Sequence, residues 1–234
     1  MKKNLPLFST LSKKIFLIKV SQLLKNCTFA YQTVCMLETK DHILKTAFIL
    51  FLKKGYKAVT MQDLEKETGL TKGAFYHYFK GKEEIFIEVI DKYHLSKKAY
   101  SISELDDHSS LSEFIHSQIE DIILRVKDLR HLADISNPDP FFISLILEAR
   151  KYYPGFTEKT KISSKATVLI WENKIKHAQG NHEIRSDIDP EIMAETMISI
   201  GMSMFKYLMI NESPEFAIDI LKRQFDQVYK LIKI

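Results

Sequence analysis

TMQDLEKETGLTKGAFYHYFKGK, residues 60–82, predicts a helix, a tight turn and a second helix. Thr60 and Asp63 have the three-residue spacing of a capping box, which satisfies free amide groups at a helix start. Gly69 can adopt the left-handed conformation that closes a helix, and Thr71 is placed to cap the helix that follows. The stretch is therefore expected to form two helices with a short, defined connection.

The second of these helices is expected to pack on one side and to face outward on the other. Phe75 and Phe79 share one face at i,i+4 spacing. Tyr76, His77 and Tyr78 follow one another, so they cannot all lie in a core, and aromatic or imidazole groups beside Lys72 suit bases and phosphates. The alternative interpretation is an ordinary pair of helices within a helical core, and the number of matching positions disfavours it.

The stretch resembles the helix-turn-helix of the tetracycline-repressor (TetR/AcrR) family of bacterial transcription regulators. That family's signature is similar to A-G-V-S-x-G-x-x-Y-x-[HY]-F-x-x-K, and residues 68–82 read TGLTKGAFYHYFKGK. Glu65 and Thr68 depart from it, because the family usually places alanines there. The resemblance implies contacts with double-stranded DNA. The positions expected at base edges are Lys72, Gly73, Ala74 and His77, and those expected near phosphates are Thr60, Tyr76, Tyr78 and Lys82. Tyr76 could serve either role, and a further contact is expected at Thr71.

The distribution of charge along the 234 residues fits a DNA-contacting N-terminal part. Residues 1–35 hold six lysines and no acid, residues 36–100 carry a net charge of +3, and residues 101–234 carry −5. With 45% hydrophobic residues, the chain can bury a sizeable core in one or two domains. The acidic C-terminal part is not expected to touch nucleic acid.

Motifs for catalysis or metal binding are missing from the sequence. Cys27 and Cys35 are eight residues apart, which suggests neither a metal pair nor a disulfide framework. There is no HExxH, GxSxG, Walker or GxGxxG motif. We therefore expect no enzyme, no catalytic residue, no metal and no cofactor. No apolar run is long enough for a membrane helix, so the expectation is a cytoplasmic protein without a membrane partner.

Residues 1–35 allow three interpretations: a basic arm on DNA, a targeting segment, or residues upstream of a true start at Met36. We favour the last, because Met36 stands where family members usually begin. The expected domains are then an atypical extension over residues 1–35, a helix-turn-helix domain over residues 36–84, and a ligand-binding and dimerisation domain over residues 85–234.

The fold is expected to be all-α, because every segment outside the breaks has helical periodicity. Proline after a capping residue marks several starts, as in Asp189-Pro190 and Ser213-Pro214. The expected helices cover residues 39–54, 60–69, 71–79, 82–101, 111–132, 140–153, 156–178, 190–210 and 214–232.

The last two helices are expected to form a homodimer through a four-helix bundle, as the resemblance also implies. The helix from Pro190 is apolar over most of its circumference, so it should be buried on two sides. Gly201 would let the backbones approach closely. The expected interface residues are Met193, Met197, Ile200, Gly201, Met204, Phe216, Ile220, Phe225 and Val228.

The hypothesis that these patterns favour is a dimeric transcription regulator, most simply a repressor that leaves a near-palindromic operator when an unknown small-molecule effector binds. The sequence alone does not distinguish a repressor from an activator. The alternative is a helical ligand-binding or enzymatic protein whose N-terminal hairpin no longer reads DNA. Aromatic, Met and charged residues of the C-terminal part form the candidate effector pocket, although such stripes are more often core. They are Phe114, Glu148, Tyr152, Trp171 and Met202.

Overall fold

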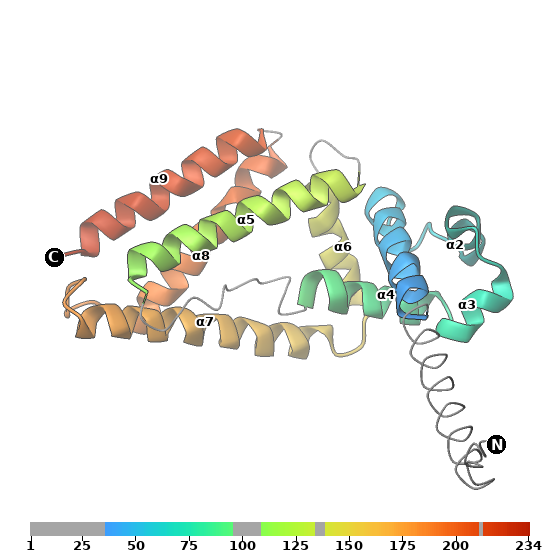
Figure 1. The fold of residues 1–234 in the computed structure, drawn as a ribbon, viewed down its shortest axis with the longest axis horizontal. Coiled ribbons are helices and arrows are strands. Elements are labelled where there is room, and N and C mark those ends of the chain that lie inside the picture. Colours follow the sequence, from blue (N-terminus) through green and yellow to red (C-terminus); the bar gives the residue numbers. More distant parts are fainter. Residues whose placement is uncertain (1–35, 96–108, 134–138, 211–212) are drawn as a thin grey trace, which may run out of the picture. The chain divides into compact units, whose positions relative to one another are not determined.

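The structure is a computed structural model that describes residues 36–95, 109–133, 139–210 and 213–234. Within these ranges the chain is helical, and the sole β-type pairing is an isolated bridge between Ile184 and Lys233. The predicted all-α fold is confirmed (Figure 1). The first helix covers residues 36–54. The others are α2 (Met61–Thr68), α3 (Lys72–Tyr78), α4 (Lys82–Ile90), α5 (Leu111–Ala133), α6 (Asp139–Tyr152), α7 (Phe156–Gly180), α8 (Pro190–Met209) and α9 (Pro214–Ile232).

The chain divides into two compact units, residues 1–43 and residues 44–234. Of the first unit the structure describes residues 36–43, which are helical. The three interpretations of residues 1–35, and the expected end of the fourth helix near residue 101, lie outside the described residues. The expected boundary between residues 84 and 85 falls inside the second unit and stays a prediction.

Proline and a capping residue begin the last two helices, as predicted. The Asp189 side chain accepts hydrogen bonds from the amides of Glu191 and Ile192, and Pro190 opens α8. Ser213 accepts from the Phe216 amide in the same way before α9. These caps satisfy amide groups that have no partner inside the helix, which explains why both helices begin where they do.

The fourth helix changes its pitch, which the sequence did not predict. α4 ends at Ile90 and continues as a π-helical turn over Asp91–Leu95. The Asp91 carboxylate accepts from the Tyr153 hydroxyl at 2.6 Å and pairs with the Lys159 ammonium at 2.8 Å. The wider turn is thus tied to the end of α6 and the start of α7 by polar contacts.

The main core of the C-terminal part lies among α5, α7, α8 and α9 (Figure 1). Trp171 is buried in this core, with its ring edge-to-face against Phe114 at 4.8 Å and parallel to Phe225 at 6.2 Å between centroids. Aromatic pairs at these separations add to the stability that burial supplies. Phe114 and Trp171 are therefore core residues that pack against each other in this structure.

The other three expected pocket residues do not join them. Met202 is 62% exposed on α8. Glu148 and Tyr152, on α6, contact the backbone and ring of Tyr56 in the turn that precedes α2. The five residues do not gather at one place in this structure, because helical spacing alone does not show which face of α6 or α8 is turned inward. The effector pocket stays a prediction. A hollow of about 570 Å³, open to solvent, lies where α6 meets α7 and includes Tyr152.

Most of the expected interface residues are buried or partly buried in the core of the single chain, and the interface itself stays a prediction. Met197, Met204 and Phe225 are almost completely buried, and Phe225 is 1% exposed. Met193, Ile200 and Val228 are partly buried against the same core, and a Cβ on Gly201 would lie 3.8 Å from Ile122 of α5. Phe216 is exposed and Ile220 is half-buried, so these two remain available to a partner. The stripe of α8 that faces solvent instead carries Met202 and Met209.

Candidate nucleic-acid interface

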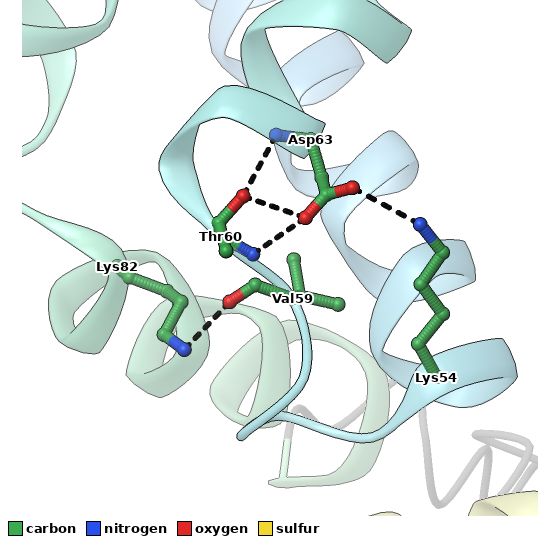
Figure 2. A network of polar contacts seen from close by, with 5 residues as sticks. All are labelled: Lys54, Val59, Thr60, Asp63 and Lys82. Carbon is green, nitrogen blue, oxygen red and sulfur yellow. Dashed lines mark hydrogen bonds and ion pairs between the residues drawn. The ribbon is translucent and has the colours of Figure 1, made fainter.

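A reciprocal cap fixes the start of α2, as predicted. The Thr60 hydroxyl accepts from the Asp63 amide at 3.1 Å, and the Asp63 carboxylate accepts from the Thr60 amide at 2.8 Å. The other carboxylate oxygen of Asp63 pairs with the Lys54 ammonium at 3.1 Å (Figure 2). The hydrogen bonds from Thr60, and then Lys54, hold the pKa of Asp63 well below its usual range. The cap therefore joins α2 to the helix over residues 36–54.

The turn between α2 and α3 has the predicted geometry. Gly69 adopts φ 70°, and its amide donates to the carbonyl of Glu65 at 3.0 Å. Thr68, which departs from the family pattern, donates its hydroxyl to the carbonyl of Leu64 at 2.7 Å and accepts from the amide of Leu70 at 3.3 Å. A hydroxyl at this position thus satisfies backbone groups at the turn, and alanine has no group that can do so.

α3 turns its core side inward and leaves most of the predicted contact residues at the surface. Thr71 caps it by accepting from the Ala74 amide at 3.3 Å, and Phe75 is fully buried beneath it. Tyr76 is 52% exposed, and the Lys72 ammonium lies 5.9 Å from its ring centroid. The exposed predicted residues are Thr60, Thr71, Lys72, Gly73, Tyr76 and His77, whereas Ala74 and Tyr78 are half-buried.

The end of α3 comes one residue earlier than the pattern of phenylalanines suggests. Phe79 is in extended conformation with φ −141° and ψ 139°, yet its side chain is buried. Its amide still donates to the carbonyl of Phe75 at 2.9 Å. The two phenylalanines therefore share the same core, although they do not share a helix.

Lys82 points inward rather than toward solvent. Its ammonium donates to the carbonyl of Val59 at 2.6 Å (Figure 2). It also donates to the carbonyl of Tyr56 at 2.8 Å, with a longer contact to the carbonyl of Lys57 at 3.4 Å. Burial, followed by the charge of Lys57, lowers the pKa of Lys82. An ammonium has three donors, and backbone oxygens of this chain receive them. In this geometry the Lys82 ammonium binds backbone carbonyls, whereas the resemblance implied that it lies near a DNA phosphate.

Two contacts at this site had no signal in the sequence. The Glu148 carboxylate accepts from the Tyr56 amide at 2.7 Å, across 92 residues of chain. Lys54 reaches Asp63 from the preceding helix. Both depend on tertiary packing, because no spacing rule connects a residue of α6 to the turn before α2.

The described ranges contain no group of three or more His, Cys, Asp or Glu side chains suited to a metal ion. Over the same ranges, every helix is too short or too polar to cross a membrane.

Comparison with known proteins matches residues 43–89 to the family described as "Bacterial regulatory proteins, tetR family". The regulator YerO of Bacillus subtilis, described as an HTH-type transcriptional regulator, is 45% identical over 58 residues, which are 25% of this chain and 20% of YerO. The TetC protein of transposon Tn10 from Escherichia coli is 28% identical over 141 residues, 59% of this chain and 68% of TetC. This chain thus spans about a fifth of YerO and about two thirds of TetC.

Solved structures share the fold well beyond the matched domain. A complex of SmeT with triclosan superposes with a TM-score of 0.60 at 18% identity, over 84% of this chain and 92% of that one. SmeT is described as the repressor of the Stenotrophomonas maltophilia multidrug efflux pump SmeDEF. At this identity the likeness concerns the fold.

Proposed function

We propose that this chain, whose residues 43–89 match the tetR family of bacterial regulatory proteins, is a sequence-specific DNA-binding transcription regulator of that family. In this proposal it acts in the cytoplasm as a homodimer and is most simply a repressor released by a small molecule. It needs no catalytic residue and no cofactor.

The observation that carries the proposal is the outward face of α3, held by caps at both ends of the turn. Lys72, Gly73, Tyr76 and His77 are exposed side by side on a helix whose inner residue, Phe75, is fully buried. A Cβ on Gly73 would meet nothing within 4 Å. The fold therefore does not require glycine there, and the missing side chain favours close approach by a partner such as DNA.

The predicted contact residues of α3 divide into two proposed roles. Lys72, Gly73, Ala74 and His77 read base edges in the major groove, whereas Tyr76 and Tyr78 contact phosphates. Thr60, which is exposed at the start of α2, is also proposed to lie near a phosphate. Phosphate contacts fix the register of a protein on DNA, and base contacts carry the sequence preference.

We place the dimer on α8 and α9, through their solvent-facing apolar residues. The stripe contains Ile192, Met202 and Met209 of α8 with Phe216 and Leu231 of α9, all exposed in the single chain. A symmetric dimer presents two copies of α3, so the operator should be a near-palindrome with half-sites about 34 Å apart or slightly more.

A small-molecule effector is proposed for the C-terminal part, residues 85–234. Support comes from SmeT, which has the same fold and was solved with triclosan. An effector that binds the DNA-free form better than the DNA-bound form, with a typical coupling of 1–3 kcal/mol, would lower operator affinity roughly 5–150-fold.

A gel-shift with the DNA upstream of this protein's own gene tests the proposal. The protein should shift that duplex at concentrations at least about tenfold lower than a scrambled duplex of equal length, at fixed salt. Equal binding to both would favour the alternative, a helical protein that no longer reads DNA.

A further inference from the structure

The turn over residues 55–59 lies between the first helix and α2, and it decides where α2 begins. Gly55 ends the preceding helix with φ 78°, its amide donating to the carbonyl of Phe51 at 2.9 Å. Val59 is fully buried and directly precedes Thr60, the cap of α2. Any displacement of this turn therefore moves the start of α2.

α6 holds this turn from one side. The Glu148 carboxylate accepts from the Tyr56 amide at 2.7 Å, and a Cβ on Gly55 would come within 3.2 Å of its other oxygen. One turn further along α6, the Tyr152 ring lies 5.2 Å from the Tyr56 ring, and the Lys57 ammonium lies 4.4 Å from the Tyr152 centroid. The contact is thus polar at the backbone and aromatic at the side chains.

α4 holds the same turn from its first residue. The Lys82 ammonium donates to the carbonyls of Tyr56 and Val59, and it lies 4.5 Å from the Tyr56 ring centroid. The amide of Tyr56 is therefore bound by α6 while its carbonyl is bound by α4. A shift between these two helices would pull on the backbone of this single residue.

We propose that Lys82 and Glu148 are positioning residues, which together set the position of α2 and α3 by holding the turn over residues 55–59. This inference rests on the proposed function, since it concerns how the reading helix is presented to DNA. It assigns to Lys82 a structural contact in place of the phosphate contact that the resemblance implied. It assigns to Glu148 a contact with this turn, whereas the sequence suggested a place in the effector pocket.

The salt dependence of DNA binding separates the two roles of Lys82. Each phosphate that a lysine neutralises makes the slope of log affinity against log salt steeper by about one. Lys82→Met should weaken binding to a duplex selected by the wild-type protein at least about threefold and leave the slope unchanged. Lys72→Met removes an exposed ammonium from the face of α3 proposed to enter the major groove and is the matched control. It should make the slope shallower, because a lysine charge that faces DNA displaces counterions from it. A shallower slope for Lys82→Met, or no loss of affinity, would overturn the proposal for Lys82.

Amide hydrogen exchange on the DNA-free protein tests Glu148 independently of any operator. Glu148→Ala removes the acceptor for the Tyr56 amide, so peptides covering residues 55–68 should exchange at least about tenfold faster. Glu148→Gln keeps a carbonyl oxygen at this position and should retain most of the protection. Glu120→Ala, at an exposed position on α5, is the control and should leave these peptides unchanged.

The proposal for Glu148 fails if Glu148→Ala leaves the exchange of residues 55–68 unchanged, or if Glu148→Gln exchanges as fast as Glu148→Ala. Failure of the proposed function has a different signature. In that case the wild-type protein would select no DNA sequence, while the exchange measurements would still report on the contact between α6 and the turn.

Discussion

Protonation of His94 should destabilise the fold as the pH falls. His94 lies in the π-helical turn after α4, 5.9 Å from the Phe142 ring and 5.8 Å from the Phe156 ring between centroids. Burial lowers the pKa of His94 from 6.5 to about 4. Because the folded pKa is below the unfolded value, the unfolded chain binds more protons in this window. The stability that the neutral imidazole allows is present above pH 6.5 and is lost as the pH falls toward 4.

The size of this effect follows from the shift. A pKa difference of one unit corresponds to about 1.4 kcal/mol, so the His94 contribution between pH 7 and pH 5 is about 2 kcal/mol. Urea unfolding at both pH values, for the wild-type protein and for His94→Phe, measures it. The variant should lose less stability over this interval than the wild type, by about the stated amount, whatever its absolute stability at pH 7. If both proteins lost the same stability, the buried neutral imidazole would not be the cause.

Two further changes test the cap and the dimer face. Thr60→Ala removes the hydroxyl that accepts from the Asp63 amide, so urea unfolding should show a free energy of unfolding lower by about 1 kcal/mol. The control Thr157→Ala, on the exposed side of α7, should change this free energy little. Equal losses in the two variants would contradict the cap. Met202→Glu should give monomers in sedimentation, while its far-UV circular dichroism stays unchanged. The control Ile162→Glu, at a position 71% exposed on α7, should leave the dimer intact. A Met202→Glu variant that stayed dimeric would refute the proposed dimer face.

Local signals predicted the helices of this protein well. The cap at Thr60, the left-handed Gly69 and the prolines that open α8 and α9 all act within a few residues, so each can be recognised in the sequence. The bounds of α9 agree with the expected range of 214–232. These features do not depend on which other helix lies nearby.

Features that depend on tertiary packing could not be predicted in the same way. α8 has two apolar stripes, and the sequence does not say that the stripe with Met197 and Met204 faces the core while the stripe with Met202 faces solvent. The direction of Lys82 depends on the carbonyls of a turn more than twenty residues earlier in the chain. The π-helical turn at Asp91–Leu95 contacts Tyr153, just after α6, and Lys159 of α7, which lie more than sixty residues later in the chain.

Selection from a library of random DNA duplexes tests the central claim most directly. The wild-type protein should enrich one near-palindromic sequence whose half-sites are about 34 Å apart or slightly more, and His77→Ala should change the preferred base within each half-site. Recovery of no common sequence by the wild-type protein would contradict the account that α3 reads DNA.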